Sequence, residues 1–203
     1  MNIKSKLNLR CLYNRKVLSV VTLLFMVALI SLPPASIFNS ASPFALGAPV
    51  VVTSQGELFD AVKNAPDGES TVIAIDRDIT LTEALKIPAD KNITLTSDSN
   101  SVLYNLRGAD GQSTITVEAY GELVLDGIIV THTANAKGTG VTVNNNGKLT
   151  LYSGRIFNNT VTNNGGGVYN NGIFIMSGGE LYNNTATNGG GVYNYANFTI
   201  TGG

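Results

Sequence analysis

A repeat of about 24 residues fills the C-terminal part of this chain. Residues 147–171 read GKLTLYSGRIFNNTVTNNGGGVYNN, residues 172–195 read GIFIMSGGELYNNTATNGGGVYNY, and a third copy begins at Ala196 with ANFTITGG. A unit of this size cannot bury its own apolar side chains. It must therefore stack on neighbouring copies, as the coils of a solenoid do.

The spacing between the copies predicts which residues lie side by side. Val168 and Val192 stand 24 positions apart, so we expect them to lie in register in neighbouring coils. Leu149 and Ile173 are also 24 positions apart, and we expect Leu149, Ile173 and Phe198, or their neighbours, to form one column. Such partners are about 4.8 Å apart. Between these positions the offset rises to 25 because of one additional residue, which we place at Asn164.

The segments between the turns predict short strands. Weaker copies lie upstream of the clear repeats, and each unit holds three β-rich segments bounded by Gly, Asp, Asn or Ser. Alternation places the leucines inward and Thr94 and Thr150 outward. We predict an all-β fold, a right-handed parallel β-helix of about 24–27 residues per coil, from about residue 71 to the C-terminus. The predicted strands are 71–75, 79–81, 93–95, 114–117, 123–125, 128–130, 141–143 and 149–151.

Glycine and asparagine recur at equivalent places in successive coils. The triplets 165–167 and 189–191 are glycines, which allow positive φ and close backbone approach where a strand turns a corner. Asn159 and Asn184 are the best candidates for a ladder of stacked side-chain amides.

One helix precedes the repeats. Ser54 and Glu57 have the spacing of a capping box, and Pro66 lies just beyond the expected end at Asn64. We predict that residues 48–70 form an N-terminal strand and a helix that covers the end of the β core, although a plain surface helix fits the same pattern. The apolar stripe of the helix consists of Leu58, Phe59, Ala61 and Val62.

The first 47 residues are typical of a secretory signal peptide. A basic segment without acidic residues precedes the apolar run 17–32, and Pro33-Pro34 follows. The run is shorter than the about 20 residues of a usual membrane span. An uncleaved anchor is the alternative. We expect cleavage after Gly47, because Pro49 would follow a cut at Ala48 directly, and we expect the protein to be secreted or held at the cell surface.

Composition excludes several function classes. After the first 48 residues, 8 basic residues face 14 acidic ones, a net charge of −6, so no basic patch for nucleic acid is expected. The single histidine excludes histidine-rich metal sites and catalysis by histidine pairs. The one cysteine, Cys11, lies in the signal segment, and the expected mature chain therefore forms no disulfide.

Residues 181–193, LYNNTATNGGGVY, resemble the repeats of adhesin-like right-handed parallel β-helix proteins of the pectin-lyase-like superfamily. Such proteins occur on the surfaces of Gram-positive bacteria and methanogenic archaea. The repeats are also similar to the FxxN…GGA(I/L/V) repeats of chlamydial polymorphic outer-membrane proteins. The resemblance is more specific for the fold than for the function. Here Leu181 or Ile156 replaces Phe, and Gly191 or Gly167 replaces Ala.

Many members of that superfamily cleave acidic polysaccharides with clustered aspartates that hold Ca²⁺ or act as acid and base. Glycoside hydrolysis needs two carboxylates roughly 5–9.5 Å apart. From residue 127 to the C-terminus the only acidic residue is Glu180. Asp76 and Asp78 would share one face of an extended segment. They suit either a weak Ca²⁺ site or a solvated turn around Arg77.

The other polar and aromatic candidates have simple structural interpretations. Asp126 is expected in a turn, and His132 as an exposed residue at a strand end. No catalytic, cofactor-binding or metal-binding residue is assigned, and no cofactor is predicted. The tyrosines Tyr169, Tyr182, Tyr193 and Tyr195 are interpreted as packing on the coil flank, with stacking against sugars as the alternative.

These observations favour an exported structural or adhesive surface protein that binds extracellular glycans or proteins by its long flank. A polysaccharide lyase or hydrolase, or a non-functional gene fragment, is the alternative. Membrane contact is expected only through the signal segment or an anchor elsewhere. Residues 201–203 match the early part of a repeat, so we expect the solenoid to be C-terminally incomplete and to continue in a longer parent protein.

Overall fold

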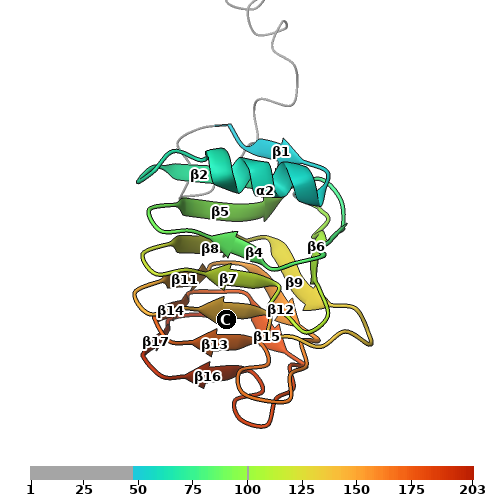
Figure 1. Cartoon of the computed structure of the whole chain (residues 1–203), viewed down its shortest axis with the longest axis vertical. Helices are drawn as coiled ribbons and strands as arrows, with labels where there is room; N and C mark the ends of the chain where they lie inside the picture. The colour runs from blue at the N-terminus through green and yellow to red at the C-terminus, as the bar shows by residue number, and fades with distance from the viewer. Residues whose placement is uncertain (1–47, 100) are drawn as a thin grey trace, which may run out of the picture. The chain divides into compact units, whose positions relative to one another are not determined.

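The computed structural model describes residues 48–99 and 101–203, and most of its regular structure is β-strand. All strand pairings are parallel, and the strands stack as a β-solenoid of about 6 turns (Figure 1). This confirms the predicted parallel β-helix. The predicted signal peptide, residues 1–47, lies outside the described residues.

The described part of the chain contains one short helix and a long series of strands. No helix there is long and apolar enough to cross a bilayer. The elements are β1 (Val50–Val52), α2 (Gln55–Asn64), β2 (Ser70–Ile75), β3 (Ile79–Thr80), β4 (Leu85–Ile87), β5 (Asn92–Ser97), β6 (Asn105–Gly108), β7 (Ile115–Val117), β8 (Glu122–Asp126), β9 (Ile128–His132), β10 (Val141–Val143), β11 (Lys148–Leu151), β12 (Gly154–Phe157), β13 (Val168–Asn170), β14 (Ile173–Met176), β15 (Glu180–Tyr182), β16 (Val192–Asn194) and β17 (Asn197–Ile200).

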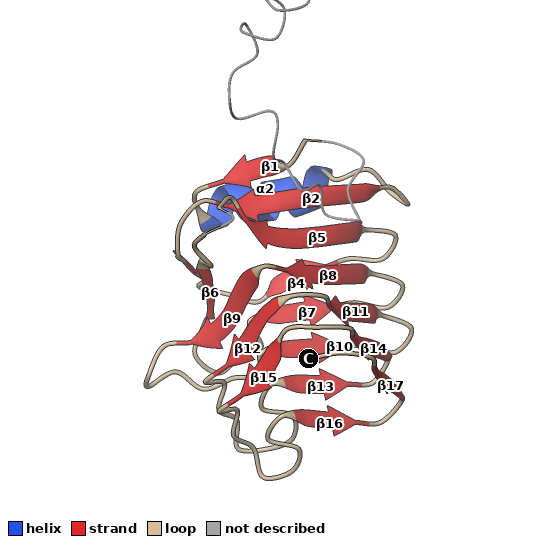
Figure 2. Cartoon of the chain, turned by 180° about the vertical axis from the view of Figure 1, so that it is seen from behind, coloured by secondary structure: helices blue, strands red, loops and turns tan. Residues whose placement is uncertain are grey.

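The strands form three sheets that run along the solenoid. Sheet A has the order β1-β2-β5-β8-β11-β14-β17, sheet B the order β3-β6-β9-β12-β15, and sheet C the order β4-β7-β10-β13-β16. Figure 2 shows the stacked strands of sheet B from behind. Each sheet therefore contains one strand from each successive coil. Side chains at equivalent positions of these strands form columns along the solenoid.

The apolar interior is one continuous hydrophobic core that extends from α2 into the last coils. Ile93, Leu123, Leu149 and Phe174 follow one another in register across sheet A, and all four are buried. At the end of this column the rings of Phe174 and Phe198 stack with centroids 4.8 Å apart. Because each coil buries its apolar side chains only with its neighbours, stacking provides the stability.

Helix α2 lies at the N-terminal end of the stack, where it contacts β1 and β2 (Figure 1). Leu58 and Val62 belong to the continuous core, as the apolar stripe predicts. Ser54 caps the helix by accepting the backbone N–H of Glu57 at 3.3 Å. The Glu57 carboxylate in turn accepts the backbone N–H of Thr53 at 2.6 Å, and this bond holds the pKa of Glu57 below its ordinary value.

The predicted register is correct at Val168, and in the column of Leu149 it includes Phe198 as predicted but is one residue off at Ile173. Val168 pairs with Val192, as the spacing predicts. Leu149, however, pairs with Phe174 and not with Ile173, which lies beside Lys148 and is exposed. A shift of one residue moves a side chain to the other face of a sheet, so the buried column has to follow Phe174.

The additional residue also lies elsewhere than predicted. Thr160 bridges to Thr185, and Asn164 bridges to Asn188. The offset thus changes from 25 to 24 between these two bridges, and the additional residue lies among positions 161–163. Asn164 itself occupies a regular position in the coil.

The glycine triplets turn the corners as expected. Gly165 and Gly189 have φ values of +69° and +61°. At Gly167 an added Cβ would lie 2.6 Å from the carbonyl oxygen of Gly191 in the next coil. Such a distance is far below van der Waals contact, so the coils can approach this closely only with glycine at position 167.

The outward threonines of sheet A are more buried than alternation predicts. Thr94 pairs with Val72 and Val124, which are buried but lie outside the continuous interior core, so this column lies on the outer face. Nevertheless Thr94 is 0% exposed and Thr150 only 8% exposed. The Thr94 hydroxyl makes no hydrogen bond. Alternation fixes which face a side chain occupies but not how much of that face is covered.

Candidate functional site

Ladders of asparagine amides join neighbouring coils, and Asn159 and Asn170 are fully buried within them. Asn159 donates to the side-chain oxygen of Asn184 at 3.0 Å, which confirms the predicted ladder pair. Two further ladders join Asn170 to Asn194 and Asn164 to Asn188, at 2.6 and 2.9 Å. Sequence reasoning missed both pairs, although the residues of each pair are 24 positions apart, which is the period of the repeat and marks equivalent positions in neighbouring coils.

The tyrosines form stacks between neighbouring coils. Tyr169 stacks on Tyr193 with ring centroids 5.7 Å apart, and Tyr195 contacts Tyr193 edge-on at 5.1 Å. A hydrogen bond with Tyr195 raises the pKa of the Tyr193 hydroxyl. On sheet B, Tyr182 stacks on Phe157 at 5.1 Å. The tyrosines thus pack along the flank, as predicted, and still leave ring surface exposed to solvent.

A groove of about 660 Å³ lies beside Tyr169 on the outer surface near sheet C. We call it the flank groove. Its lining comes from three successive coils, and it contains hydroxyl and amide side chains but no charged residue. Among the four tyrosines considered from the sequence, only Tyr169 lines it. The lining residues are Thr139, Thr142, Val161, Thr162, Asn163, Asn164, Tyr169, Thr187 and Asn188.

The charged residues of the last coils are largely neutralised by one another. Arg155 forms an ion pair with Glu180 at 2.8 Å, and Lys148 forms one with Glu122 at 2.9 Å. Each pair joins neighbouring strands of one sheet, across the register of the solenoid. The Glu180 carboxylate is thus bound to the Arg155 guanidinium.

Asp76 and Asp78 have separate cationic partners. Arg77 binds Asp76 at 2.9 Å, and this hydrogen bond lowers the pKa of Asp76. Asp78 accepts the backbone N–H of Asn105 at 2.8 Å and the Arg107 guanidinium at 2.7 Å. Burial raises the pKa of Asp78, but these hydrogen bonds outweigh it and hold the pKa below its ordinary value. Residues 48–99 and 101–203 contain no cluster of three or more potential metal ligands.

His132 was predicted to be exposed, and this prediction is wrong. The residue ends β9, but its side chain is only 5% exposed. A Cβ at Gly108 or at Gly138 would lie 2.4 Å from its Nε2 atom, so these two glycines make room for the ring. Nδ1 lies 2.7 Å from the side-chain oxygen of Asn159, and Nε2 lies 3.0 Å from the carbonyl oxygen of Gln112. The imidazole therefore links neighbouring coils from within a buried network.

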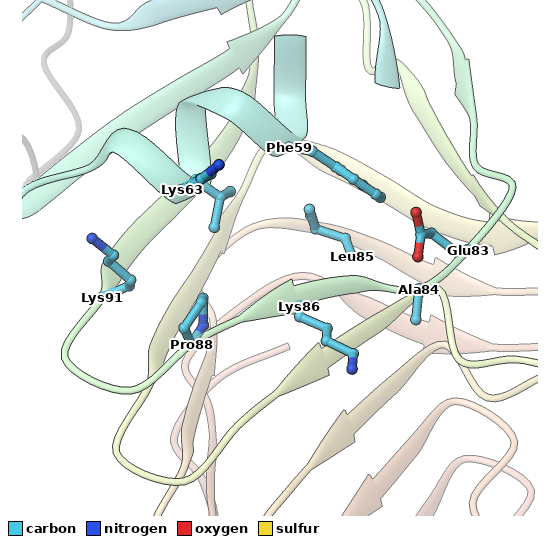
Figure 3. A pocket seen from close by; sticks show the side chains of 9 residues that line it. Phe59, Lys63, Glu83, Ala84, Leu85, Lys86, Pro88 and Lys91 are labelled. Carbon is cyan, nitrogen blue, oxygen red and sulfur yellow. The ribbon is translucent and has the colours of Figure 1, made fainter. Parts of the chain in front are cut away.

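A second cavity, of about 270 Å³, separates α2 from β4 (Figure 3). Its apolar wall includes Phe59 and Leu85, and lysines surround it. Figure 3 shows the ammonium groups of Lys63, Lys86 and Lys91 pointing away from one another. Lys91 is moreover bound to Asp67 at 2.7 Å. The lysines therefore do not converge on one anion.

Asp126 lies at the end of β8, directly before the turn at Gly127, and accepts the Ser153 hydroxyl at 2.8 Å. Asp126 is thus the last residue of a strand, and the turn predicted to contain it begins at the next residue.

No family model matches the chain, and no curated protein and no solved structure is significantly similar to it. The flank groove and its tyrosines are therefore the best candidate site on geometric grounds.

Proposed function

We propose that this chain is an exported surface protein with a structural or adhesive role, and that it binds extracellular partners by its long flank. The observation that carries the proposal is the repeated outer surface near sheet C, on which neighbouring coils present the amides of Asn164 and Asn188, threonine hydroxyls and stacked tyrosines. A surface of this kind offers many equivalent weak contacts, which add up for a multivalent partner.

The proposal includes membership of the adhesin-like β-helix proteins of the pectin-lyase-like superfamily. It rests on the parallel solenoid together with the GGGVYN repeats. The export signal is inferred from residues 1–47 alone. Both parts are open to experiments that need no knowledge of the ligand.

Surface location is tested by protease treatment of intact cells of the source organism. Proteinase K should remove the protein from intact cells, while a cytoplasmic marker survives. Protein that resists digestion until the cells are lysed would contradict export to the surface.

The competing function, depolymerisation of acidic polysaccharides, is tested with purified protein on pectate and alginate, with and without Ca²⁺. We expect no new reducing ends and no unsaturated products above a heat-denatured control. Product release with ordinary turnover would replace the adhesive proposal by an enzymatic one.

A further inference from the structure

The flank groove combines hydrogen-bonding capacity with electrical neutrality. Thr139 and Thr142 come from the first of the three coils that line the groove, and Thr187 and Asn188 come from the third. The side chain of Asn163 makes no hydrogen bond to another described residue. We propose that this groove binds an uncharged polysaccharide, a proposal that rests on the adhesive function and names its ligand class.

An aromatic wall supports this ligand class. Tyr169 lines the groove, and Tyr193 continues the aromatic surface into the next coil. Tyr195, which is 66% exposed, extends it further. An aromatic ring presents an apolar face beside polar neighbours, and a sugar ring likewise carries an apolar C–H face and polar hydroxyls.

The repetition of the groove favours a polymer over a single sugar. Thr162 and Thr187 both line it, as do Asn164 and Asn188, and each pair comes from neighbouring coils. Equivalent groups therefore recur along the solenoid at about the strand spacing of 4.8 Å. A chain of similar sugar units that runs along the axis meets the same chemistry again in each coil.

Charge argues against an anionic polysaccharide. Lys148 and Arg155, on neighbouring faces of these coils, are already paired with acidic side chains. The chain beyond the signal segment has a net charge of −6. A polyanion would meet repulsion at long range and no free cation within the groove.

The test is affinity electrophoresis of the purified protein in native gels. Separate gels contain hydroxyethylcellulose, yeast mannan, soluble β-1,3-glucan, polygalacturonate or gelatin. We expect at least one neutral polysaccharide to retard the protein, while polygalacturonate and gelatin leave its mobility unchanged. Retardation by polygalacturonate or gelatin alone, or by none of the five, would overturn the inference.

Two variants locate the binding site. Tyr169→Ala should raise the apparent Kd for the retarding polymer by at least about tenfold, because a central aromatic contact is lost. Asn163→Ala removes an exposed amide, so it should weaken binding without affecting folding. The matched control is Tyr182→Ala, which deletes a stacked, exposed tyrosine on sheet B. Circular dichroism verifies that each variant is folded.

The inference fails if Tyr182→Ala weakens binding as much as Tyr169→Ala, or if neither groove variant has an effect. Such a result leaves surface location untouched, because the protease experiment measures it separately. Conversely, protein inaccessible on intact cells would refute the proposed function even if the groove bound a neutral polysaccharide in the gel.

Discussion

At the residue scale, the buried His132 network ties adjacent coils together. The Asn159 side chain has partners in the coil on each side of its own. It contacts His132 at 2.7 Å and donates to the carbonyl oxygen of Val130 at 3.3 Å in one coil, and it donates to the side-chain oxygen of Asn184 at 3.0 Å in the other. Polar groups buried in this way are costly to leave without partners.

The first prediction therefore concerns His132→Ala. The substitution leaves the Asn159 side-chain oxygen and the Gln112 carbonyl without their partner and opens a space beside Gly108 and Gly138. We expect the free energy of unfolding to fall by about 1–3 kcal/mol, measured by urea denaturation. Asn145→Ala, in an exposed turn, is the control and should change it by less than about 0.5 kcal/mol. Equal stability of the two variants would contradict the network.

Thr94 provides a prediction of the opposite sign. Its hydroxyl is fully buried and makes no hydrogen bond, so a valine of nearly the same shape should fit better. Thr94→Val is expected to raise the free energy of unfolding by about 1 kcal/mol in urea denaturation. A loss of stability would mean that the hydroxyl has a partner, such as bound water.

The lowered pKa of Asp78 predicts how the stability of the fold responds to acid. Its pKa is lowered in the folded state, so its contribution is complete above the ordinary carboxyl value of about 4 and is lost as pH falls through the lower folded value. We expect Asp78→Asn to flatten the decrease in Tm below about pH 4. Asp60→Asn, on the exposed side of α2, is the control. An unchanged pH dependence in Asp78→Asn would show that the carboxylate contributes nothing.

At the element scale, helix α2 should be required for the first coils. Leu58 is 0% exposed and belongs to the continuous core. Leu58→Ala should lower the free energy of unfolding by about 2–5 kcal/mol. Hydrogen exchange should accelerate first in β2 and β5, the nearest long strands. Lys63→Ala, on the exposed face, is the matched control. If Leu58→Ala accelerated exchange equally in all strands, or did not change it, helix α2 would not have a capping role.

The bounds of several elements could be predicted closely, although the strands β12 to β17 within the repeats were predicted only as β-rich segments without bounds. The strands at 141–143 and 149–151, and helix 54–64, differ from the observed bounds by one residue at most. The strands β4 and β6 were missed, because Lys86 and Arg107 interrupt short apolar runs that no clear repeat supports. Stacking on neighbouring coils stabilises them, and this contribution is invisible in a local pattern.

The candidate site could be predicted only in part. Tyr169 was recognised as a residue of the coil flank, but the groove beside it is assembled from side chains of three coils. His132 was assigned wrongly because the glycines that accommodate it, Gly108 and Gly138, lie in other segments. A repeat predicts columns of side chains well. It does not predict the cavities that arise where irregular turns meet those columns.

At the scale of the whole molecule, the solenoid is a one-dimensional array. Each sheet adds one strand per coil, and the hydrophobic core, the amide ladders and the ion pairs all join nearest neighbours. Stability is therefore expected to be a sum of coil and interface terms. The same in-register stacking builds the flank groove, so the functional proposal depends on it as well.

That stacking is tested most directly by disulfide trapping between cysteines on the outer face of sheet C, with Cys11 replaced by serine. Tyr169 and Tyr193 are partners in adjacent strands, whereas Thr142 and Tyr193 are two coils apart. Paired strands lie about 4.8 Å apart, within the Cα range of a disulfide, and two coils lie about 9.6 Å apart, outside it. We expect mild oxidation of Tyr169→Cys/Tyr193→Cys to give an intramolecular disulfide, detected by mass spectrometry, whereas Thr142→Cys/Tyr193→Cys should remain reduced. Efficient trapping of the second pair, or none of the first, would contradict the solenoid register.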